Sequence, residues 1–240
     1  MKRIFILLSI AVLVLSACQV QVDKAFDASS LTHELDSITE IILSENRNSQ
    51  LANIDYTHND KDVDRCIEIC DTLIAHKIGH DPIIIKLRIL SIAKRYKEFI
   101  EFGNSEICSS YELYPVPGVF KCRLDAMQSH LNGDKKSEKR YIELALEKIN
   151  QYIKDNKSTF ESLLKMNREE FDSIVVANGK SNQPYVKAFM TIMMYPIYYT
   201  YANGIDAWYK EFDKLRKKYP NAQVWDSISD SKPSQNIMEF

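Results

Sequence analysis

The sequence is poor in the two residues that most often interrupt regular structure. Its 240 residues include only 6 glycines and 7 prolines, and tryptophan occurs twice. Glycine and proline supply most of the tight turns that a sheet of many short strands requires. Their scarcity, together with abundant Ile, Leu, Lys and Glu, argues against a turn-rich β fold and favours long helices. We therefore expect an all-α protein.

The sequence also lacks a large excess of charge and the signatures of common catalytic sites. The formal net charge is −2, so the charge gives no reason to expect binding to nucleic acid. There is no Gly-x-Ser-x-Gly elbow, phosphate-binding loop or His-Glu-x-x-His pair. Acidic neighbours such as Glu169 and Glu170 point to different faces of a helix. We expect no enzyme activity, no cofactor and no nucleic-acid partner.

A short apolar run follows two basic residues at the start of the chain. Lys2 and Arg3 precede apolar residues 4–15, a run shorter than the roughly 20 residues that a membrane-spanning helix needs. Two small residues then stand before Cys18. This arrangement resembles the signal peptide and lipobox of bacterial lipoproteins. The resemblance implies that residues 1–17 are removed and that Cys18 carries the lipid.

Acyl chains on Cys18 would anchor the protein at a membrane without insertion of the polypeptide, because more than one chain makes anchoring stable. Gln19 follows, where an aspartate would resemble an inner-membrane retention signal, so the outer membrane of the bacterial cell envelope is favoured. An ordinary secretory leader or an uncleaved anchor is the alternative. Residues 18–30 are polar and patternless, and we interpret them as a flexible tether.

Four cysteines lie outside the leader, and an oxidising envelope compartment permits disulfides. Cys108 and Cys122 flank a proline-containing turn between two helical patterns, so a disulfide between them would join the helices of a hairpin. Cys66 and Cys70 are four residues apart on one expected helix and are awkward partners for each other. The alternative is that all four are buried small apolar residues.

The same two cysteines, Cys66 and Cys70, precede His76 and His80, and these four residue types can bind zinc. Only five residues separate the cysteine pair from the histidine pair. One helix would then hold all four side chains along a common stripe, which does not close a tetrahedral site. We expect no metal site, and we place the histidines near a helix C-terminus, where they suit the helix dipole.

Residues 31–220 carry apolar side chains at the three-and-four spacing of amphipathic helices. The expected helices are 31–42, 62–77, 82–93, 96–114, 117–131, 141–153, 160–166, 171–176, 185–201 and 207–219. Residues 46–60 form a polar break in this pattern. Residues 221–240 are expected to be a C-terminal tail, in which Val224 and Trp225 dock on the last helix.

A unit of helix, short turn, helix and proline recurs in this domain at about 34 residues. The most specific segments are Tyr96 to Ile100, Gly133-Asp134 followed by Ala145-Leu146, and the two pairs Asp81-Pro82 and Tyr219-Pro220. These segments resemble parts of tetratricopeptide repeats. Tyr96 to Ile100 resembles the start of the second helix, Gly133-Asp134 with Ala145-Leu146 resembles the inter-helix turn and its later Ala-Leu, and the two pairs that end in proline resemble the terminal proline.

The resemblance covers roughly residues 60–154 and 183–220. It implies that the helical-repeat domain of residues 31–220 is a right-handed α-solenoid of antiparallel helix pairs, tetratricopeptide-like, with some irregular helices. The family's tryptophan is missing from its place, and the unit lengths vary. An irregular helical bundle shares the same amphipathic hairpins and is the alternative.

Residues 190–201 are rich in methionine and tyrosine, and a proline lies within them. Tyrosine joins an apolar ring to a polar hydroxyl, which suits a binding surface. We expect the concave face of the solenoid to bind a partner. The candidate residues are Tyr195, Tyr198 and Tyr199 in the last unit, with Lys86, Arg88 and Arg123 in earlier units. A tyrosine-rich core helix is the alternative.

These patterns favour a membrane-anchored envelope lipoprotein that acts as a protein-binding helical-repeat scaffold or assembly factor, with an unidentified protein partner. The resemblance to tetratricopeptide lipoproteins implies roles such as outer-membrane or pilus assembly. An immunity-type lipoprotein that sequesters a toxin is one alternative. An envelope solute binder or unrecognised enzyme is another, and it would have a closed apolar pocket with converging polar groups.

Overall fold

The computed structural model describes residues 26–51, 59–79, 81–111, 113–176, 183–229 and 237–239. These parts of the chain are mostly helical and contain no β-strand. The prediction of an all-α fold is therefore confirmed. Residues 1–17, Cys18 and the tether as far as residue 25 lie outside the described residues.

The helices follow the order expected from the sequence, and several of their bounds lie within a few residues of the predicted ones. They are α2 (Ala28–Leu51), α3 (Asp60–Ala75), α4 (Asp81–Ile92), α5 (Tyr96–Gly103), α6 (Glu106–Ser109), α7 (Val119–Leu131), α8 (Lys135–Asp155), α9 (Lys157–Leu163), α10 (Arg168–Phe171), the π-helix η1 (Asp172–Val176), α11 (Gln183–Asn203), α12 (Ile205–Lys218), α13 (Val224–Ser229) and the 3₁₀ turn η3 (Ile237–Glu239). The bounds of α2, α5 and α8 differ more from the predicted ones.

Local capping determines several of these bounds. At the start of α3, Asn59 accepts a hydrogen bond from the backbone N–H of Lys61 (3.2 Å). At the start of α8, Asp134 accepts one from the backbone N–H of Ser137 (3.0 Å). Such side chains satisfy N–H groups that the first turn leaves open. Gly133 has a φ of 72°, a left-handed conformation that glycine adopts without strain, and it allows the tight turn from α7 to α8.

The first helix, α2, is longer than predicted at both ends. It begins at Ala28, inside the predicted tether, and it continues to Leu51, inside the predicted polar break. Leu35 and Ile42 are each 1 % exposed and pack into a cluster with α3. Most of the remaining surface of α2 faces water. The ends of this helix are therefore mostly polar and lack the apolar periodicity by which a helix is predicted.

The single helix predicted for residues 96–114 is divided in two. The first part, α5, ends at Gly103. Ser105 then starts α6 by accepting a hydrogen bond from the backbone N–H of Cys108 (3.4 Å). Serine is common at helix starts because its hydroxyl oxygen can accept a hydrogen bond from a backbone N–H that the first turn leaves open. The apolar spacing continues through both parts, so apolar periodicity alone does not show the division.

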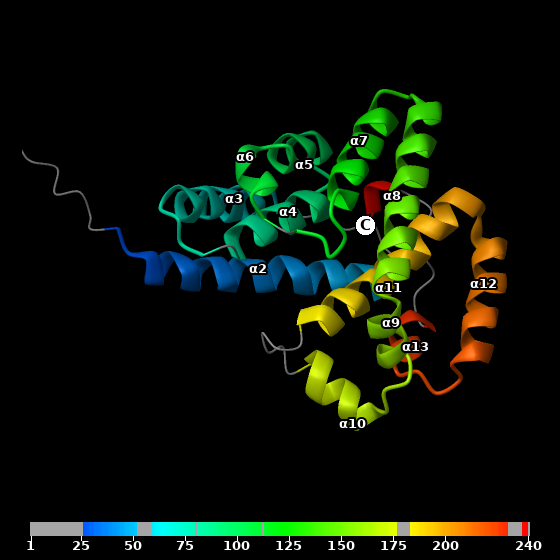
Figure 1. Ribbon diagram of the computed structural model, residues 1–240. Helices are drawn as coiled ribbons and strands as arrows, with labels where there is room; N and C mark the ends of the chain where they lie inside the picture. Colours follow the sequence, from blue (N-terminus) through cyan, green and yellow to red (C-terminus); the bar gives the residue numbers. More distant parts are fainter. Residues whose placement is uncertain are drawn as a thin grey trace, which may run out of the picture.

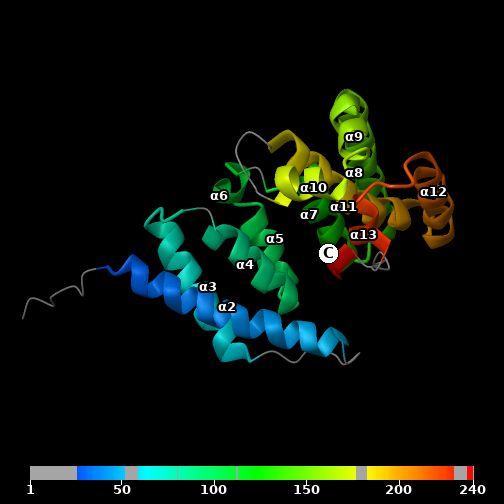
Figure 2. The ribbon, with the colours of Figure 1, turned by 90° about the horizontal axis from the view of Figure 1, so that it is seen from below.

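The longer helices pack mainly against their neighbours along the chain. Contacts join α2 to α3, α3 to α4, α4 to α5, α5 to α7, and α7 to α8; α11 then packs against α8 and α12. Figure 1 shows α7 and α8 as a hairpin between the N-terminal helices and α12, with α11 crossing beside α8 to reach α12. Figure 2, from below, shows α2 at one side of the molecule and α12 at the other.

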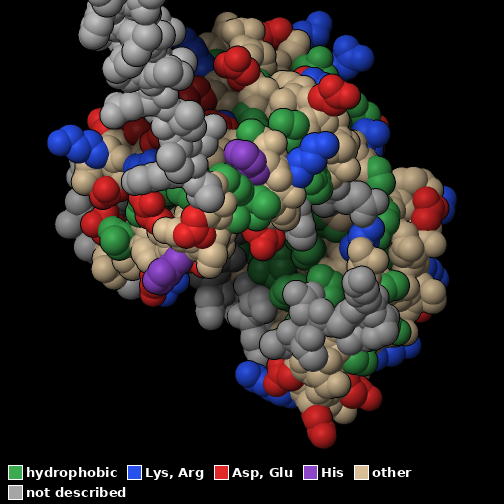
Figure 3. Space-filling model, turned by 90° about the vertical axis from the view of Figure 1, so that its left-hand side faces the viewer, with side chains coloured by type: hydrophobic (Ala, Val, Ile, Leu, Met, Phe, Trp, Pro, Cys, Tyr) green, Lys and Arg blue, Asp and Glu red, His purple; other side chains and the backbone are tan. Residues whose placement is uncertain are grey.

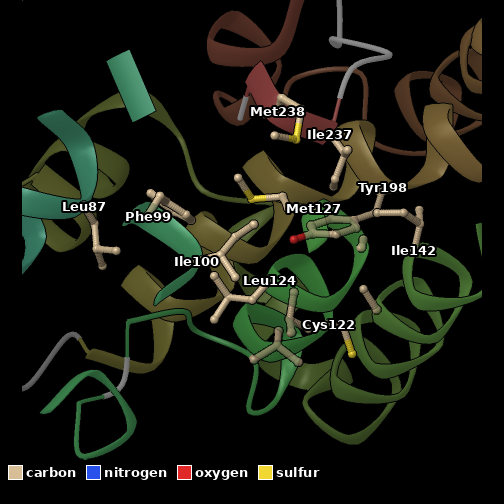
Figure 4. Close-up of a cluster of buried hydrophobic side chains, with 14 of the residues drawn as sticks. Leu87, Phe99, Ile100, Cys122, Leu124, Met127, Ile142, Tyr198, Ile237 and Met238 are labelled. Carbon is tan, nitrogen blue, oxygen red and sulfur yellow. The ribbon is translucent and has the colours of Figure 1, made fainter. Parts of the chain in front are cut away.

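Two large apolar clusters form the core of the N-terminal and central parts. One spans α4, α5, α7 and α8 and includes Tyr198 of α11 and Ile237 of η3 (Figure 4). The other joins α2, α3 and α4. Helix α4 belongs to both, since Leu90 packs in the first and Ile89 in the second. This shared helix connects α2 and α3 to the centre of the molecule.

The C-terminal tail docks on the last long helix, as predicted. Val224 and Trp225 are buried, and the ring of Trp225 packs edge-on against Phe212 of α12 at 5.6 Å between centroids. The indole Nε1 of Trp225 also donates a hydrogen bond to the backbone oxygen of Tyr219 (2.6 Å). Helix α13 is thereby held against α12.

The four cysteines outside the leader are free thiols and all are buried. Cys108 and Cys122, considered above as a possible disulfide, are thus not joined in this structure. Both side chains pack in the central apolar cluster, and burial raises the pKa of each thiol. Cys66 and Cys70 are likewise buried, in the cluster between α2 and α3. All four behave as small apolar core residues, which was the alternative interpretation.

Candidate binding groove

A groove of about 740 Å³ is lined by residues from both halves of the chain, mainly from α4, α5 and α7. We call it the binding groove. Figure 3 shows hydrophobic side chains gathered in a hollow on one face of the molecule. The residues that line the binding groove are Asn46, Ile84, Leu87, Arg88, Ser91, Ile92, Lys94, Tyr96, Phe99, Leu113, Tyr114, Phe120, Arg123, Met190 and Met238.

The lining combines apolar walls with charge of one sign. Most of the side chains are aliphatic, aromatic or methionine, and the three charged ones are Arg88, Lys94 and Arg123. No aspartate or glutamate is among the lining residues in the part of the chain that the structure describes. A partly enclosed site with one sign of charge and apolar walls concentrates ligands of the opposite sign. The binding groove therefore suits an apolar ligand that carries negative charge.

Arg123 provides the deepest of these charges. Its side chain is only 5 % exposed. The Nη1 group donates a hydrogen bond to the hydroxyl of Tyr114 (2.7 Å), and the guanidinium carbon lies 5.0 Å from the ring centroid of Phe99. A hydroxyl oxygen and the face of an aromatic ring replace part of the water that a buried guanidinium loses. These contacts hold the arginine in one position beside the groove.

Three aromatic rings surround this arginine and stiffen the wall. The ring centroids of Tyr114 and Phe120 are 5.2 Å apart, and those of Phe99 and Phe120 are 6.2 Å apart. Both distances lie in the range of favourable tilted and edge-to-face contacts. The wall joins α5, the segment before α7, and α7 itself, so the groove is built into the central core.

Arg88 contributes a charge at the exposed part of the groove. Among the described residues, no carboxylate pairs with its guanidinium. Nearby basic residues differ, because Lys86 pairs with Asp71 (2.5 Å) and Arg95 with Glu98 (2.7 Å). The side chain of Arg88 is thus available to a carboxylate of a bound ligand.

The C-terminal turn η3 contributes one residue, Met238, to the lining of the groove. Ile237 is fully buried and Met238 is 4 % exposed, and both belong to the central cluster. In Figure 4, Ile237 is directed toward Met127 and Tyr198. Burial of an apolar side chain stabilises by about 1.5–3 kcal/mol, and ordering a residue costs about 1–2 kcal/mol. For η3, the free energy gained by burying two apolar side chains is therefore similar in size to the entropic cost of ordering three residues.

The structure brings together two of the six predicted partner-binding residues. Arg88 and Arg123 both line the binding groove. Lys86 does not, because its ammonium lies 4.4 Å from the ring centroid of Phe102 and pairs with Asp71. These neighbours hold the lysine on a different side of α4, away from the groove.

The three predicted tyrosines do not line the groove either. Tyr198 is 1 % exposed inside the central cluster, where burial raises the pKa of its phenol. Tyr195 and Tyr199 pack on Trp208, at 6.1 and 6.0 Å between ring centroids. The structure therefore places Tyr198 in the interior and not on a surface that a partner could contact. The tyrosines of α11 mainly join α11 to its neighbours.

Most residues of the groove, above all those of its aromatic wall, do not stand out in the sequence. One signal was present: Arg123 follows Phe120 by three residues and precedes Met127 by four, so the spacing places a charged residue on the apolar face of α7. An arginine at such a position requires polar or aromatic neighbours in the core. Its neighbours Phe99 and Tyr114 come from other segments and could not be identified from spacing.

Other features of the described residues add no second site. No group of three or more His, Cys, Asp or Glu side chains among them is arranged to hold a metal ion. His76 stacks on Phe26 at 3.7 Å between ring centroids, and His80 lies outside the described residues. A search of the described helices for one with the length and apolar character to cross a membrane finds none.

Comparison with known proteins gives no match to this chain: no family model fits it, and neither a curated protein nor a solved structure resembles it significantly.

Proposed function

We propose that this protein is a lipid-anchored binding protein of the bacterial cell envelope, and that the binding groove holds an apolar, acidic segment of a partner protein. The lipid is the one that the lipobox resemblance places on Cys18. From α2 to α8 the longer helices pack in chain order, and this order supports a tetratricopeptide-like solenoid as the scaffold. In this proposal the protein acts through binding and not through catalysis.

The observation that carries the proposal is the composition of the groove. Three cations line it, no acid is among its described lining residues, and its walls are aromatic and aliphatic. Protein-binding sites combine apolar anchors with such charged groups, and aromatic residues and arginine dominate their binding energy. Because Arg88 is exposed and has no carboxylate partner among the described residues, it gives the incoming segment a definite ionic contact.

The groove can be tested by site-specific photo-crosslinking in cells that carry the full chain. A photoreactive amino acid replaces Ile84, which lines the groove and is 48 % exposed. We expect a discrete crosslinked protein in the envelope fraction. Arg88→Glu should lower its yield by about tenfold, because exchanging attraction for repulsion at one contact changes binding by about 1.4 kcal/mol.

The matched controls lie on α8. Arg140→Glu makes the same charge change at an exposed position outside the groove and should leave the yield unchanged. A photoreactive residue at Leu144, which is 39 % exposed, should give no specific product. Equal products from positions 84 and 144, or an undiminished yield with Arg88→Glu, would remove the groove as the binding site.

One observation favours a second candidate, an apolar anionic solute. The volume of the groove lies within the range of about 300–1,000 Å³ that is usual for small-ligand sites. Dodecanoate is a suitable probe, because it combines a carboxylate with an apolar chain. Saturable binding of dodecanoate that Arg88→Glu weakens, in a protein that gives no crosslinked partner, would favour this solute function over the protein-binding one.

A further inference from the structure

We propose that η3 is a built-in ligand that fills part of the binding groove and leaves the rest open, and that the partner segment carries the same pattern of two adjacent large apolar residues followed by an acidic residue. The part concerning the partner rests on the proposed function; the part concerning η3 does not. The turn contributes Ile237 and Met238, and Glu239 follows them in the sequence.

The first support is the position of η3 relative to the chain. The preceding helix, α13, packs in a separate cluster with Trp208 and Phe212 of α12. In contrast, η3 packs against α7 and belongs to the central cluster. Figure 1 shows it beside α7 and α8 near the middle of the molecule. The buried side chains of the turn therefore pack in a different cluster from those of the preceding helix, as the side chains of a bound peptide would.

The second support is the match between the turn and the groove. Met238 is both a buried residue of η3 and a lining residue of the groove, together with Arg123 and Tyr114. The groove is basic, and the residue after Met238 is acidic. Met238 lies among the same lining residues as Arg123, and an apolar residue followed by an acidic one is the combination that the basic, apolar composition of the groove favours. A partner segment with this pattern would compete with η3.

The test uses the full chain with a specific protease site introduced at residues 231–235, so that the protein folds with its C-terminal segment attached. The probe is a fluorescein-labelled, amidated peptide of residues 235–240, and its fluorescence anisotropy measures binding. We expect 1:1 saturable binding after cleavage and at least tenfold weaker binding before cleavage, because the attached segment competes at high effective concentration.

Variants of the probe and of the chain sharpen the test. A peptide with Met238→Asp should bind at least tenfold more weakly, and one with Glu239→Gln severalfold more weakly. In the uncleaved chain, Met238→Lys should raise the affinity for the unmodified peptide toward that of the cleaved chain, while the helical circular dichroism stays the same.

Three results would overturn the proposal: equal binding before and after cleavage, a cleaved segment that never exchanges with the probe, or loss of helical structure when the cleaved segment is removed. The last two would make η3 a permanent part of the core. Because the probe is derived from this chain, a failure here leaves the crosslinking test of the proposed function intact. Conversely, probe binding without any crosslinked partner would show that the groove accepts only its own segment.

Discussion

A carboxylate is buried at the turn between α7 and α8. Glu138 is 1 % exposed; one carboxylate oxygen lies 2.9 Å from Nδ1 of His130, and the other accepts a hydrogen bond from Nζ of Lys135 (3.1 Å). Both partners reach solvent, with side chains that are 33 % and 71 % exposed. The carboxylate thus connects two helices at the point where the chain reverses.

Replacing this carboxylate should destabilise the protein measurably. Glu138→Ala removes hydrogen bonds to two groups that can carry charge, so we expect a loss of about 2 kcal/mol in the free energy of unfolding. The loss stays below the 3–5 kcal/mol typical of a broken buried ion pair, because His130 and Lys135 can turn to water. Urea denaturation of the full chain would measure it.

The control for this prediction lies on the same helix. Glu143 is 50 % exposed and lies 3.7 Å from Lys139, so Glu143→Ala should cost less than about 0.5 kcal/mol. If both variants lost the same stability, the buried contacts of Glu138 would contribute nothing beyond those of a surface pair.

At the scale of helices, the approach of α5 to α7 depends on Gly103. A Cβ atom at this position would lie 2.8 Å from Cδ2 of Leu124 and 3.2 Å from Cζ of Phe120. Both neighbours are packed in the central cluster. A glycine at the end of α5 therefore lets the two helices, and with them the aromatic wall of the groove, come close together.

Enlarging this glycine should separate the two helices. We expect Gly103→Val to lower the free energy of unfolding by about 1–3 kcal/mol, the usual cost of overpacking. Gly103→Ala should cost less, because alanine is smaller and regains about 1 kcal/mol of helix propensity. Chemical denaturation of both variants gives the order. A valine variant as stable as the natural chain would contradict the close packing.

Element by element, the sequence predicts much of the fold, because helix formation is local. Amphipathic spacing identified the helices around Leu73, Leu90 and Ile149, and the turn at Gly133-Asp134. It missed the division at Gly103, where apolar residues continue across a helix end, and it missed the last turns of α2, where polar residues predominate. Both errors occur where the apolar periodicity and the helix do not end at the same residue.

At the scale of the whole molecule, the binding groove could not be predicted in the same way. Its lining includes Asn46, Arg123, Met190 and Met238, which no periodic pattern relates to one another. Only the tertiary packing of α4, α7, α11 and η3 brings them together. Arg88 and Arg123 were identified as candidates because they are basic residues on expected helices, whereas their apolar neighbours resemble any other core residues.

The attachment of the whole molecule to the membrane gives one further prediction. If Cys18 carries acyl chains, Cys18→Ser should move the protein from the membrane pellet to the soluble fraction, because the affinity comes from buried methylene groups at about 0.8 kcal/mol each. Gln19→Ala is the control and should remain in the pellet. Fractionation followed by immunoblotting measures both. A serine variant that still sediments with membranes would refute the lipid anchor.

The return of η3 to α7 has a consequence for biogenesis. Neighbouring helices can pair as soon as each emerges, since most contacts are local and such contacts form quickly. The binding groove, however, needs residue 46 and residue 238 together. In a chain that emerges with its N-terminus first, most helices would thus pair before the lining of the binding groove is complete.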